Sequence, residues 1–328
     1  MKLRILLLIL AAGLALAVLP GALVAQSGSF HRSYQVNGPV LLVIHNGSGD
    51  VRVSAMPGNT VTVDASIREN GSFFWGPDPR VVQRIEDQPP IEQDGNSIRI
   101  SLVDSGWTRH VSIRYTITVP PQTQVQAETG SGDIYLDSLQ RDARLQTGSG
   151  DVHVNHHTGN VHAASGSGDI SFGSISGSAD FSTGSGDVRG RDVSGHLRAS
   201  TGSGEVSVAS VGQGAYANTG SGDVSLGQVS GDLTASTGSG EVSVGGQLDG
   251  SHRWDLGSGS GEIRVSLPAS AFVRARLETG SGDIAVRFPQ RDTNISRHSW
   301  SGTIGSQSGS PSALLIAHAD SGGIVVAH

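Results

Sequence analysis

Hydrophobic and polar residues alternate over short stretches along most of this chain. Residues 219–236 read TGSGDVSLGQVSGDLTAS, in which Val224 and Leu226 flank Ser225 and the same alternation returns around Leu233. Alternation with a period of two indicates a strand that buries one face. Each segment of this kind is therefore predicted to contain two short strands separated by a turn.

The same segment recurs at a fixed distance. A Ser-Gly-acid-aliphatic motif repeats every eighteen residues from Ser131 to Ser239, and the step then widens to about twenty or twenty-one. A short fixed period indicates one unit stacked on itself, and eighteen residues cannot hold two strands and a crossover helix. We therefore predict an all-β fold: a single-stranded parallel β-solenoid, similar to a β-helix, of about twelve coils. The motif starts at Ser48, Ser131, Ser149, Ser167, Ser185, Ser203, Ser221, Ser239, Ser260 and Ser281, with degenerate copies at Ser301 and Ser321.

The glycines of the motif are expected to form the corner of each coil. Gly220 and Gly222 flank Ser221, and glycine accepts a positive φ without a steric penalty. Asp223 is expected to fold its carboxylate back onto nearby backbone N–H groups. Corners stacked in register would align the inward residues in two aliphatic ladders. One ladder contains Val152, Val188, Val206, Val224 and Val242, and the other contains Val161, Leu197, Ala215 and Leu233.

The chain divides into four regions at the sequence level. Residues 1–25 form a leader, residues 129–258 form the regular eighteen-residue array, and residues 259–328 form longer C-terminal coils. Residues 26–128 are predicted to be an irregular β cap, because a solenoid needs a covered end; a separate small β-sandwich is the alternative. We expect strands in GPVLLVIHNGSGDVRVSA, NTVTVDASI, GNSIRISLV and HVSIRYTITVPP, and a helical turn from Val81 to Glu86.

The leader has the pattern of a secretory signal peptide. Lys2 and Arg4 precede an uncharged run from Ile5 that ends in small residues at Ala25, where cleavage is expected. The run is also long enough to span a bilayer as an uncleaved anchor. Both alternatives place the rest of the protein in the periplasm, on the cell surface or outside the cell.

The composition excludes several mechanisms for the exported part. The chain has no cysteine, and its only lysine is Lys2, so disulfides, thiolate nucleophiles, Cys-ligated metals and Schiff-base lysines are excluded. A formal net charge of −7 makes nucleic acid an unsuitable partner. Aromatic residues make up only 5%, so the core is expected to be aliphatic.

The order of these motifs resembles that of a family of uncharacterised bacterial exported proteins called putative adhesins, which are β-solenoids. The residues that carry the resemblance are NGSGDVRV, YTITVPP and ETGSGDIYL, followed by the recurring S-G-D-[IV] corners. The resemblance extends over about residues 38–328. It implies a β-solenoid that acts in adhesion or in interactions at the cell envelope, and it brings no catalytic residues.

The corner acids are the candidate for cation binding. Carboxylates at the same place in successive coils would lie about 5 Å apart, where like charges repel. Calcium between the coils is one interpretation, but only one corner in two is acidic, which favours a structural turn-capping role. We therefore assign no metal, cofactor or catalytic residue and expect folding without metal. The acids are Asp133, Asp151, Asp169, Asp187, Glu205, Asp223, Glu241, Glu262 and Asp283.

Two other polar sets have structural interpretations. The histidines His153, His156, His157 and His162 share one coil, but their spacing favours solvated surface histidines over a Zn²⁺ or Ni²⁺ site. A row of threonines occupies inward-facing positions, one in each coil. This placement favours hydroxyls that form hydrogen bonds between coils, and it argues against a flat ice-binding surface. The row contains Thr129, Thr147, Thr183, Thr201, Thr219, Thr237 and Thr279, with Ser165 and Ser258 in the same place.

The tryptophans and one pair of phenylalanines lie in the cap region or in the later, less regular coils. We predict that they cover the ends of the rod, with binding of sugars or partners as the alternative. They are Phe73, Phe74, Trp75, Trp107, Trp254 and Trp300.

The outward positions of the coils indicate the class of function. They are mostly Ser, Thr, Asp, Arg and His, without a continuous apolar stripe, so binding is expected to be polar and distributed along the rod. We expect a non-catalytic exported β-solenoid in adhesion or surface interaction, with an envelope or host-surface glycan or protein as partner. The alternatives are a membrane-anchored envelope scaffold or sensor, and a carbohydrate-active solenoid enzyme with carboxylates and a base in a groove.

Overall fold

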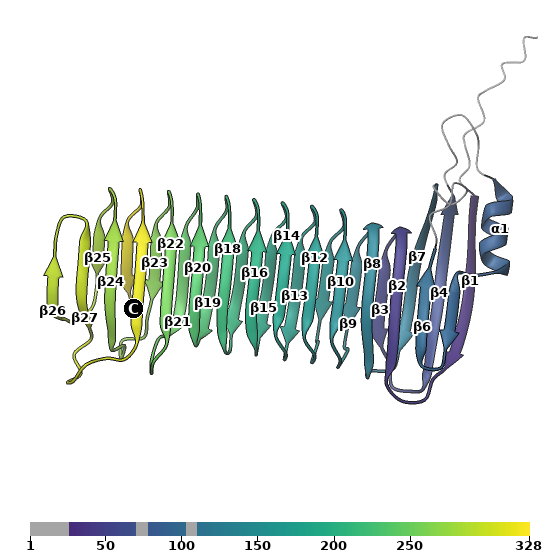
Figure 1. Ribbon diagram of the computed structural model, residues 1–328, viewed down its shortest axis with the longest axis horizontal. Helices are drawn as coiled ribbons and strands as arrows, with labels where there is room; N and C mark the ends of the chain where they lie inside the picture. Colours follow the sequence, from purple (N-terminus) through teal and green to yellow (C-terminus); the bar gives the residue numbers. More distant parts are fainter. Residues whose placement is uncertain (1–25, 70–77, 103–109) are drawn as a thin grey trace, which may run out of the picture.

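The computed structural model describes residues 26–69, 78–102 and 110–328. These residues form a long rod of two facing β-sheets, with the N-terminal strands and a helix at one end (Figure 1). No helix in these ranges is long and apolar enough to cross a membrane. The leader, together with Phe73, Phe74, Trp75 and Trp107, lies outside the described residues.

The regular array builds both sheets at once. Each unit gives one strand to the sheet that starts at β1, here called sheet A, and one to the sheet that ends at β5, here called sheet B; each strand pairs in parallel with its counterpart in the next unit. The predicted all-β solenoid is therefore confirmed. The array strands of sheet A are β9 (Ile134–Asp137), β11 (Val152–Asn155), β13 (Ile170–Ile175), β15 (Val188–Val193), β17 (Val206–Val211), β19 (Val224–Ser230), β21 (Val242–Gln247) and β23 (Ile263–Ser266). Those of sheet B are β8 (Thr123–Ser131), β10 (Ala143–Thr147), β12 (Val161–Ser165), β14 (Ala179–Thr183), β16 (His196–Thr201), β18 (Gly214–Thr219), β20 (Asp232–Thr237) and β22 (Arg253–Ser258).

The core consists of the two aliphatic ladders. Val188 pairs with Val206, and Val206 pairs with Val224, along sheet A. Leu197 pairs with Ala215 in the same way along sheet B. Every predicted member of both ladders is buried, so this prediction is confirmed. Full burial of one such side chain stabilises the fold by roughly 1.5–3 kcal/mol before the entropy of ordering it is subtracted.

Two phenylalanines fit the core because small residues lie beside them. Phe172 and Phe181 face each other between the sheets, with ring centroids 4.9 Å apart. Phe172 is the register partner of Gly190, where a Cβ would lie 2.1 Å from the phenyl ring. Phe181 is the partner of Ala163 and Ala199. Large and small residues therefore alternate between coils to keep the core closely packed.

A buried hydroxyl closes each corner. Thr201 Oγ1 donates a hydrogen bond to the carbonyl of Gly186 in the preceding coil (2.8 Å) and accepts one from the N–H of Gly204 in its own coil (3.1 Å). Ser165 makes the same two bonds in its coil, both at 2.8 Å. The hydroxyls therefore bond from coil to coil as predicted, and they satisfy backbone groups that the turn leaves without a strand partner.

The predicted positive φ of the corner glycines is found at the first two corners, at Gly49 (108°) and Gly132 (158°), but not along the rest of the regular array. Gly222 does not have a positive φ, so that expectation is wrong for this corner. Instead, a Cβ on Gly222 would lie 2.1 Å from the carbonyl oxygen of Gly204 in the coil before it. Glycine is needed because the backbone of one corner stacks directly on the backbone of the next.

The N-terminal region extends both sheets. β2 and β3 form a coil that stacks in parallel on β8 and β9, and β1, β4 and β7 add antiparallel pairs to sheet A. The predicted helical turn lies within α1, which packs on β1 and β4 and buries Val81, Val82 and Ile85. The elements are β1 (Gln26–Gln35), β2 (Val40–Ser48), β3 (Val51–Ala55), β4 (Thr60–Glu69), α1 (Pro79–Asp87), β5 (Ile91–Asp94), β6 (Ser97–Ser101) and β7 (Val111–Val119).

The C-terminal coils do not stack in chain order. β28 lies between β22 and β24 in sheet B, and β29 lies between β23 and β25 in sheet A. The copy of the motif at Ser321 therefore lies between the copies at Ser260 and Ser281 in the stack. The copy at Ser301 lies in an antiparallel strand and forms no corner. The predicted succession of coils is wrong here. The strands are β24 (Val273–Thr279), β25 (Ile284–Val286), β26 (Gln290–Ile295), β27 (Ser299–Ile304), β28 (Leu314–Ala319) and β29 (Ile324–Ala327).

The two described tryptophans have different positions. Trp300 is buried in β27 opposite Leu277, at the end of the rod, as predicted. Trp254 is fully buried between Leu233 and Leu315 in a ladder of the core, where its Nε1–H donates to the carbonyl of Gly231. The prediction that Trp254 covers an end is therefore wrong, because a strand from further along the chain lies on its far side.

Candidate binding groove

The corner acids lie along one edge of the rod, but their carboxylates bond to the next coil. Asp133 Oδ1 accepts the N–H of Asp151 (3.0 Å), and Asp151 Oδ1 accepts the N–H of Asp169 (2.8 Å). Asp223 accepts the N–H of Glu241 in the same way (2.8 Å), so it bonds a backbone N–H as expected, but the N–H belongs to the next coil. A carboxylate reaches the next coil because the backbones of adjacent corners are in contact.

The longer acids of the same edge are paired with arginines. Arg189 forms ion pairs with Asp187 and Glu205, and Arg264 bridges Glu241 and Glu262. These pairs offset part of the repulsion between stacked carboxylates. In the described ranges, no group of three or more His, Cys, Asp or Glu side chains could hold a metal ion.

The four clustered histidines separate in the fold. His156 lies beside Asp137, His153 bonds to Ser171 on the outside of sheet A, and His162 lies on sheet B. His157 is only 2% exposed, so the prediction of four solvated histidines is wrong for this residue. Its burial lowers the pKa of the His157 imidazole below the ordinary value.

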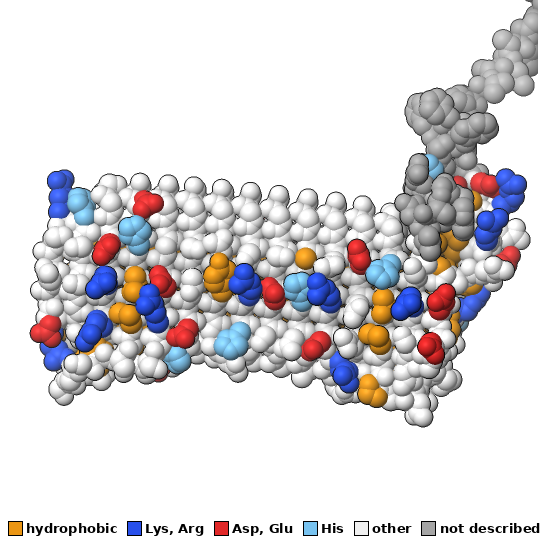
Figure 2. Space-filling model, in the orientation of Figure 1, with side chains coloured by type: hydrophobic (Ala, Val, Ile, Leu, Met, Phe, Trp, Pro, Cys, Tyr) orange, Lys and Arg blue, Asp and Glu red, His pale blue; other side chains and the backbone are white. Residues whose placement is uncertain are grey.

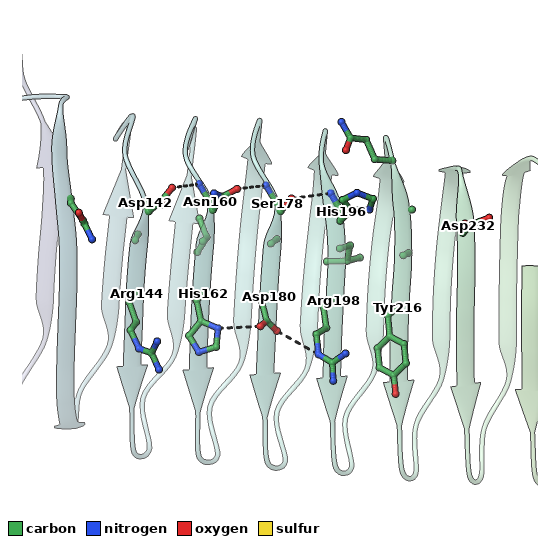
Figure 3. Close-up of a pocket in the computed structure, with 18 of the residues that line it drawn as sticks. Asp142, Arg144, Asn160, His162, Ser178, Asp180, His196, Arg198, Tyr216 and Asp232 are labelled. Carbon is green, nitrogen blue, oxygen red and sulfur yellow. Dashed lines mark hydrogen bonds and ion pairs between the residues drawn. The ribbon is translucent and has the colours of Figure 1, made fainter. Parts of the chain in front are cut away.

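A groove of about 750 Å³ runs along the outer face of sheet B, from β8 to β20. Two rows of outward side chains border it, and the strand backbones form its floor (Figure 3). In the space-filling view, charged side chains follow one another along this face (Figure 2). The groove crosses seven successive strands of sheet B in the regular array. The upper row contains Asp142, Asn160, Ser178 and His196, and the lower row contains Arg144, His162, Asp180, Arg198 and Tyr216.

The upper row is held in place by hydrogen bonds between side chain and backbone. Asp142 Oδ1 accepts the N–H of Asn160 (3.0 Å), Asn160 Oδ1 accepts that of Ser178 (2.9 Å), and Ser178 Oγ accepts that of His196 (3.2 Å). Each bond links one coil to the next (Figure 3). This wall of the groove is therefore preorganised and does not have to be ordered when a ligand binds.

The lower row consists of side chains that contact one another across the coils. Asp180 lies between His162 (3.3 Å) and Arg198 (3.9 Å). The guanidinium of Arg198 lies over the ring of Tyr216, 4.6 Å from its centroid. Tyr216 is 37% exposed, so its ring and hydroxyl remain available to a ligand. The row combines an aromatic surface with hydrogen-bond donors and acceptors at the spacing of the coils.

Sequence reasoning placed part of this groove on the surface without recognising it as a site. Asp, Arg and His were expected at outward positions, and Asp180, His196 and Arg198 do lie on the outer face. Tyr216 was missed. The signal was nonetheless present, because Tyr216 falls in the same position of the eighteen-residue unit as Asp180 and Arg198, with which it aligns in register.

Comparison with known proteins identifies the family. The family described as Toastrack DUF4097 matches residues 94–217 and, again, residues 177–326. The chain belongs to this family. The two overlapping matches fall on a continuous stack of coils, as expected when one repeated unit fills the array. No curated protein matches this chain.

Several solved structures are similar to the Toastrack chain at low identity. A putative adhesin from Parabacteroides merdae has 11% identity and a TM-score of 0.34, with 92% of this chain and 96% of that chain covered. A putative cell adhesion protein from Clostridium sporogenes has 13% identity and a TM-score of 0.23, with 92% and 99% covered. A putative lipid binding protein from Parabacteroides distasonis has 11% identity and a TM-score of 0.32, with 92% and 96% covered. Similarity at these levels assigns no function to this chain.

Proposed function

We propose that this protein is a non-catalytic, exported β-solenoid that binds a linear surface polymer, a glycan, along the groove of sheet B. The observation that carries the proposal is the lower row, in which Asp180, Arg198 and Tyr216 present polar groups and a ring from successive coils. A glycan chain offers hydroxyls and apolar ring faces at regular intervals. Each contact is weak, and the repeated contacts add because later ones form at high effective concentration.

The leader supports export to the periplasm, the cell surface or the medium, because its charge and apolar run are those of a secretory signal. If the leader is instead retained, the same rod becomes a membrane-anchored scaffold or sensor. The start of the mature protein, determined by mass spectrometry, separates these two forms. A start near Gln26 favours the free exported rod.

A carbohydrate-active enzyme is the second candidate, because the groove contains carboxylates and imidazoles. His162 and Asp180 lie 3.3 Å apart on its lower row, and Asp142 lies on its upper row. Both carboxylates already have structural partners: Asp142 binds a backbone N–H, and Asp180 lies beside Arg198. We therefore infer binding without cleavage, and product analysis of the bound polymer tests this inference.

The experiment measures binding of purified protein to linear polysaccharides, dextran as a neutral probe and polygalacturonate as an acidic one, by affinity electrophoresis. The changes Arg198→Ala and Tyr216→Ala should each weaken binding several-fold, since each removes one contact of many. The matched control is Arg189→Ala on sheet A, which removes an arginine from the opposite face and should bind as the unchanged protein does.

Coil deletion tests whether the contacts are distributed. Removing residues 201–218 joins Ser200 to Thr219, keeps both ladders in register, and shortens the groove by the coil that carries Tyr216. Removing residues 219–236 is the control, because it takes only Asp232 from the lining of the groove and leaves both rows from Asp142 to Tyr216 intact. The first deletion should weaken binding and the second should not. Three outcomes contradict the proposal. They are equal binding by the two deletion variants, loss of all binding after a single substitution, and release of shortened polymer.

A further inference from the structure

A second pocket lies further along the same face, near the C-terminal end of the rod. It has a volume of about 540 Å³ and is bounded by β22, β24, β27 and β28. Arg253, Arg274 and Arg276 line it, together with one acid, Asp292. In Figure 2, arginine side chains lie among hydrophobic ones at that end of the molecule, with acidic side chains nearby. The pocket is therefore rich in positive charge in a chain whose formal net charge is −7.

The inserted strand β28 creates this arrangement. Its residue Leu314 pairs with Arg253 of β22 on one side and with Arg274 of β24 on the other. Two residues later, Ile316 is flanked by Asp255 and Arg276 in the same way. With strands about 4.8 Å apart, arginines on both sides of one apolar residue can reach the same bound group.

The charge of the pocket is only partly compensated. Arg253 donates to Asp255 at 2.8 Å. The guanidinium groups of Arg274 and Arg276 have no ion-pair or hydrogen-bond partner within the part of the chain that the structure describes. Both residues are exposed. Such unpaired guanidinium groups present planar sets of N–H donors, which bind the two oxygens of a carboxylate or sulfate side by side.

The pocket continues the rows that border the groove. The lower row passes from Tyr216 to Thr234 and Asp255, then across Ile316 to Arg276. Four strand spacings separate Tyr216 from Arg276, which is about 19 Å. One extended polymer lying in the groove would therefore reach the arginines without leaving the face of sheet B.

We propose that the pocket of Arg253, Arg274 and Arg276 binds a carboxylate or sulfate group of an acidic polysaccharide whose chain lies along the groove. This inference rests on the proposed function, which supplies the polymer in the groove. The three arginines are the reason for expecting that polymer to be acidic. It makes the preferred ligand acidic rather than neutral. It also gives the rod a direction, because the anionic contact is at one end of the groove.

The test uses the full chain and oligomers of polygalacturonate, with the methyl-esterified oligomers of the same length as the neutral probe, by isothermal titration calorimetry. The double change Arg274→Gln and Arg276→Gln should weaken binding of the acidic oligomer at least about tenfold, because charge-assisted hydrogen bonds are lost. The control Arg68→Gln and Arg287→Gln removes the same charge at exposed positions associated with sheet A and should change affinity less than about twofold. Added salt should weaken acidic binding and leave neutral binding unchanged.

The outcomes separate this inference from the proposed function. If the arginine change weakens acidic binding while Tyr216→Ala has no effect, the pocket is supported and the groove is not. If Tyr216→Ala weakens binding and the arginine change does not, the groove stands and the pocket inference is overturned. Equal affinity of the unchanged protein for acidic and esterified oligomers also overturns it. Equally tight binding of single-stranded DNA of matched charge overturns the assignment to polysaccharide.

Discussion

Replacing Gly222 with alanine should force two coils apart. The new Cβ would lie 2.1 Å from the carbonyl oxygen of Gly204 and 2.7 Å from its carbonyl carbon. A carbon–oxygen contact is normally about 3.3 Å or longer, so the corners would have to separate by roughly 1 Å. Both neighbouring atoms belong to the backbone, and no side-chain rotation can relieve the clash.

The cost follows from the hydrogen bonds that hold these corners together. Thr219 Oγ1 donates to the carbonyl of Gly204 (2.8 Å), and the N–H of Val206 donates to the carbonyl of Asp223 (2.9 Å). Each bond contributes about 1 kcal/mol, and a buried group left unpaired costs about 1–3 kcal/mol. We therefore expect a loss of about 2–4 kcal/mol in the free energy of unfolding.

Urea unfolding followed by circular dichroism measures this loss, and native-state hydrogen exchange locates it, because solenoids can open locally. The matched control is Gly257→Ala, where the Cβ would meet only the Cβ of Ser236 at an ordinary 3.7 Å. Its stability should change by less than about 1 kcal/mol. Equal stability of the two alanine variants refutes the reasoning. The reasoning is also refuted if Gly222→Asn is clearly more stable than Gly222→Ala. Asparagine would be tolerated better than alanine only if the position required a positive φ.

Three further predictions concern the core, pH and metal. Thr201→Val should lower the free energy of unfolding by about 1–3 kcal/mol, because it leaves a carbonyl and an N–H of the corner unpaired; a neutral effect in urea unfolding contradicts this. Burial lowers the pKa of His157 below 6.5 in the folded protein, so the unfolded chain takes up the proton first and stability should fall as pH decreases below about 6.5. His157→Leu should flatten that dependence, and an unchanged slope of stability against pH would show that another group is responsible. Chelator should leave the melting temperature within about two degrees, whereas a rise of about ten degrees with millimolar calcium would mean that the corner acids bind cations.

The regular array was predictable because every coil has the same neighbours. An alternation such as that around Ser225, repeated every eighteen residues, specifies both the strand and its partner. β1 has no such pattern in its sequence QSGSFHRSYQ and was not predicted, because its antiparallel pairing with β4 depends on residues far along the chain. The insertion of β28 was unpredictable for a related reason. A corner such as that at Ser321 fits against any other corner, so the sequence does not select its neighbours.

The candidate site was predictable to a similar degree. Aligning the repeats would have placed His157 in one ladder with Leu139 and Ile175, both of which are buried, and so would have shown that it faces the core. The same alignment brings Tyr216 into line with Arg198. The alignment also places Arg253 and Arg274, twenty-one residues apart, at matching positions of neighbouring coils. It could not show that β28 lies between them, because that strand comes from later in the chain.

The insertion of β28 and β29 has a consequence for how the rod is made. In the middle of the array each coil can settle on the one before it as the chain emerges, because its partner is only eighteen residues behind. When β24 is synthesised it cannot yet join the stack of coils, because β28, the strand that lies between it and β22, comes later in the chain. Until β28 arrives, the segment from Val273 to Ile304 can pair only within itself, β24 with β27 and β27 with β26. Its exposed strand edges make it prone to aggregate until β28 is in place.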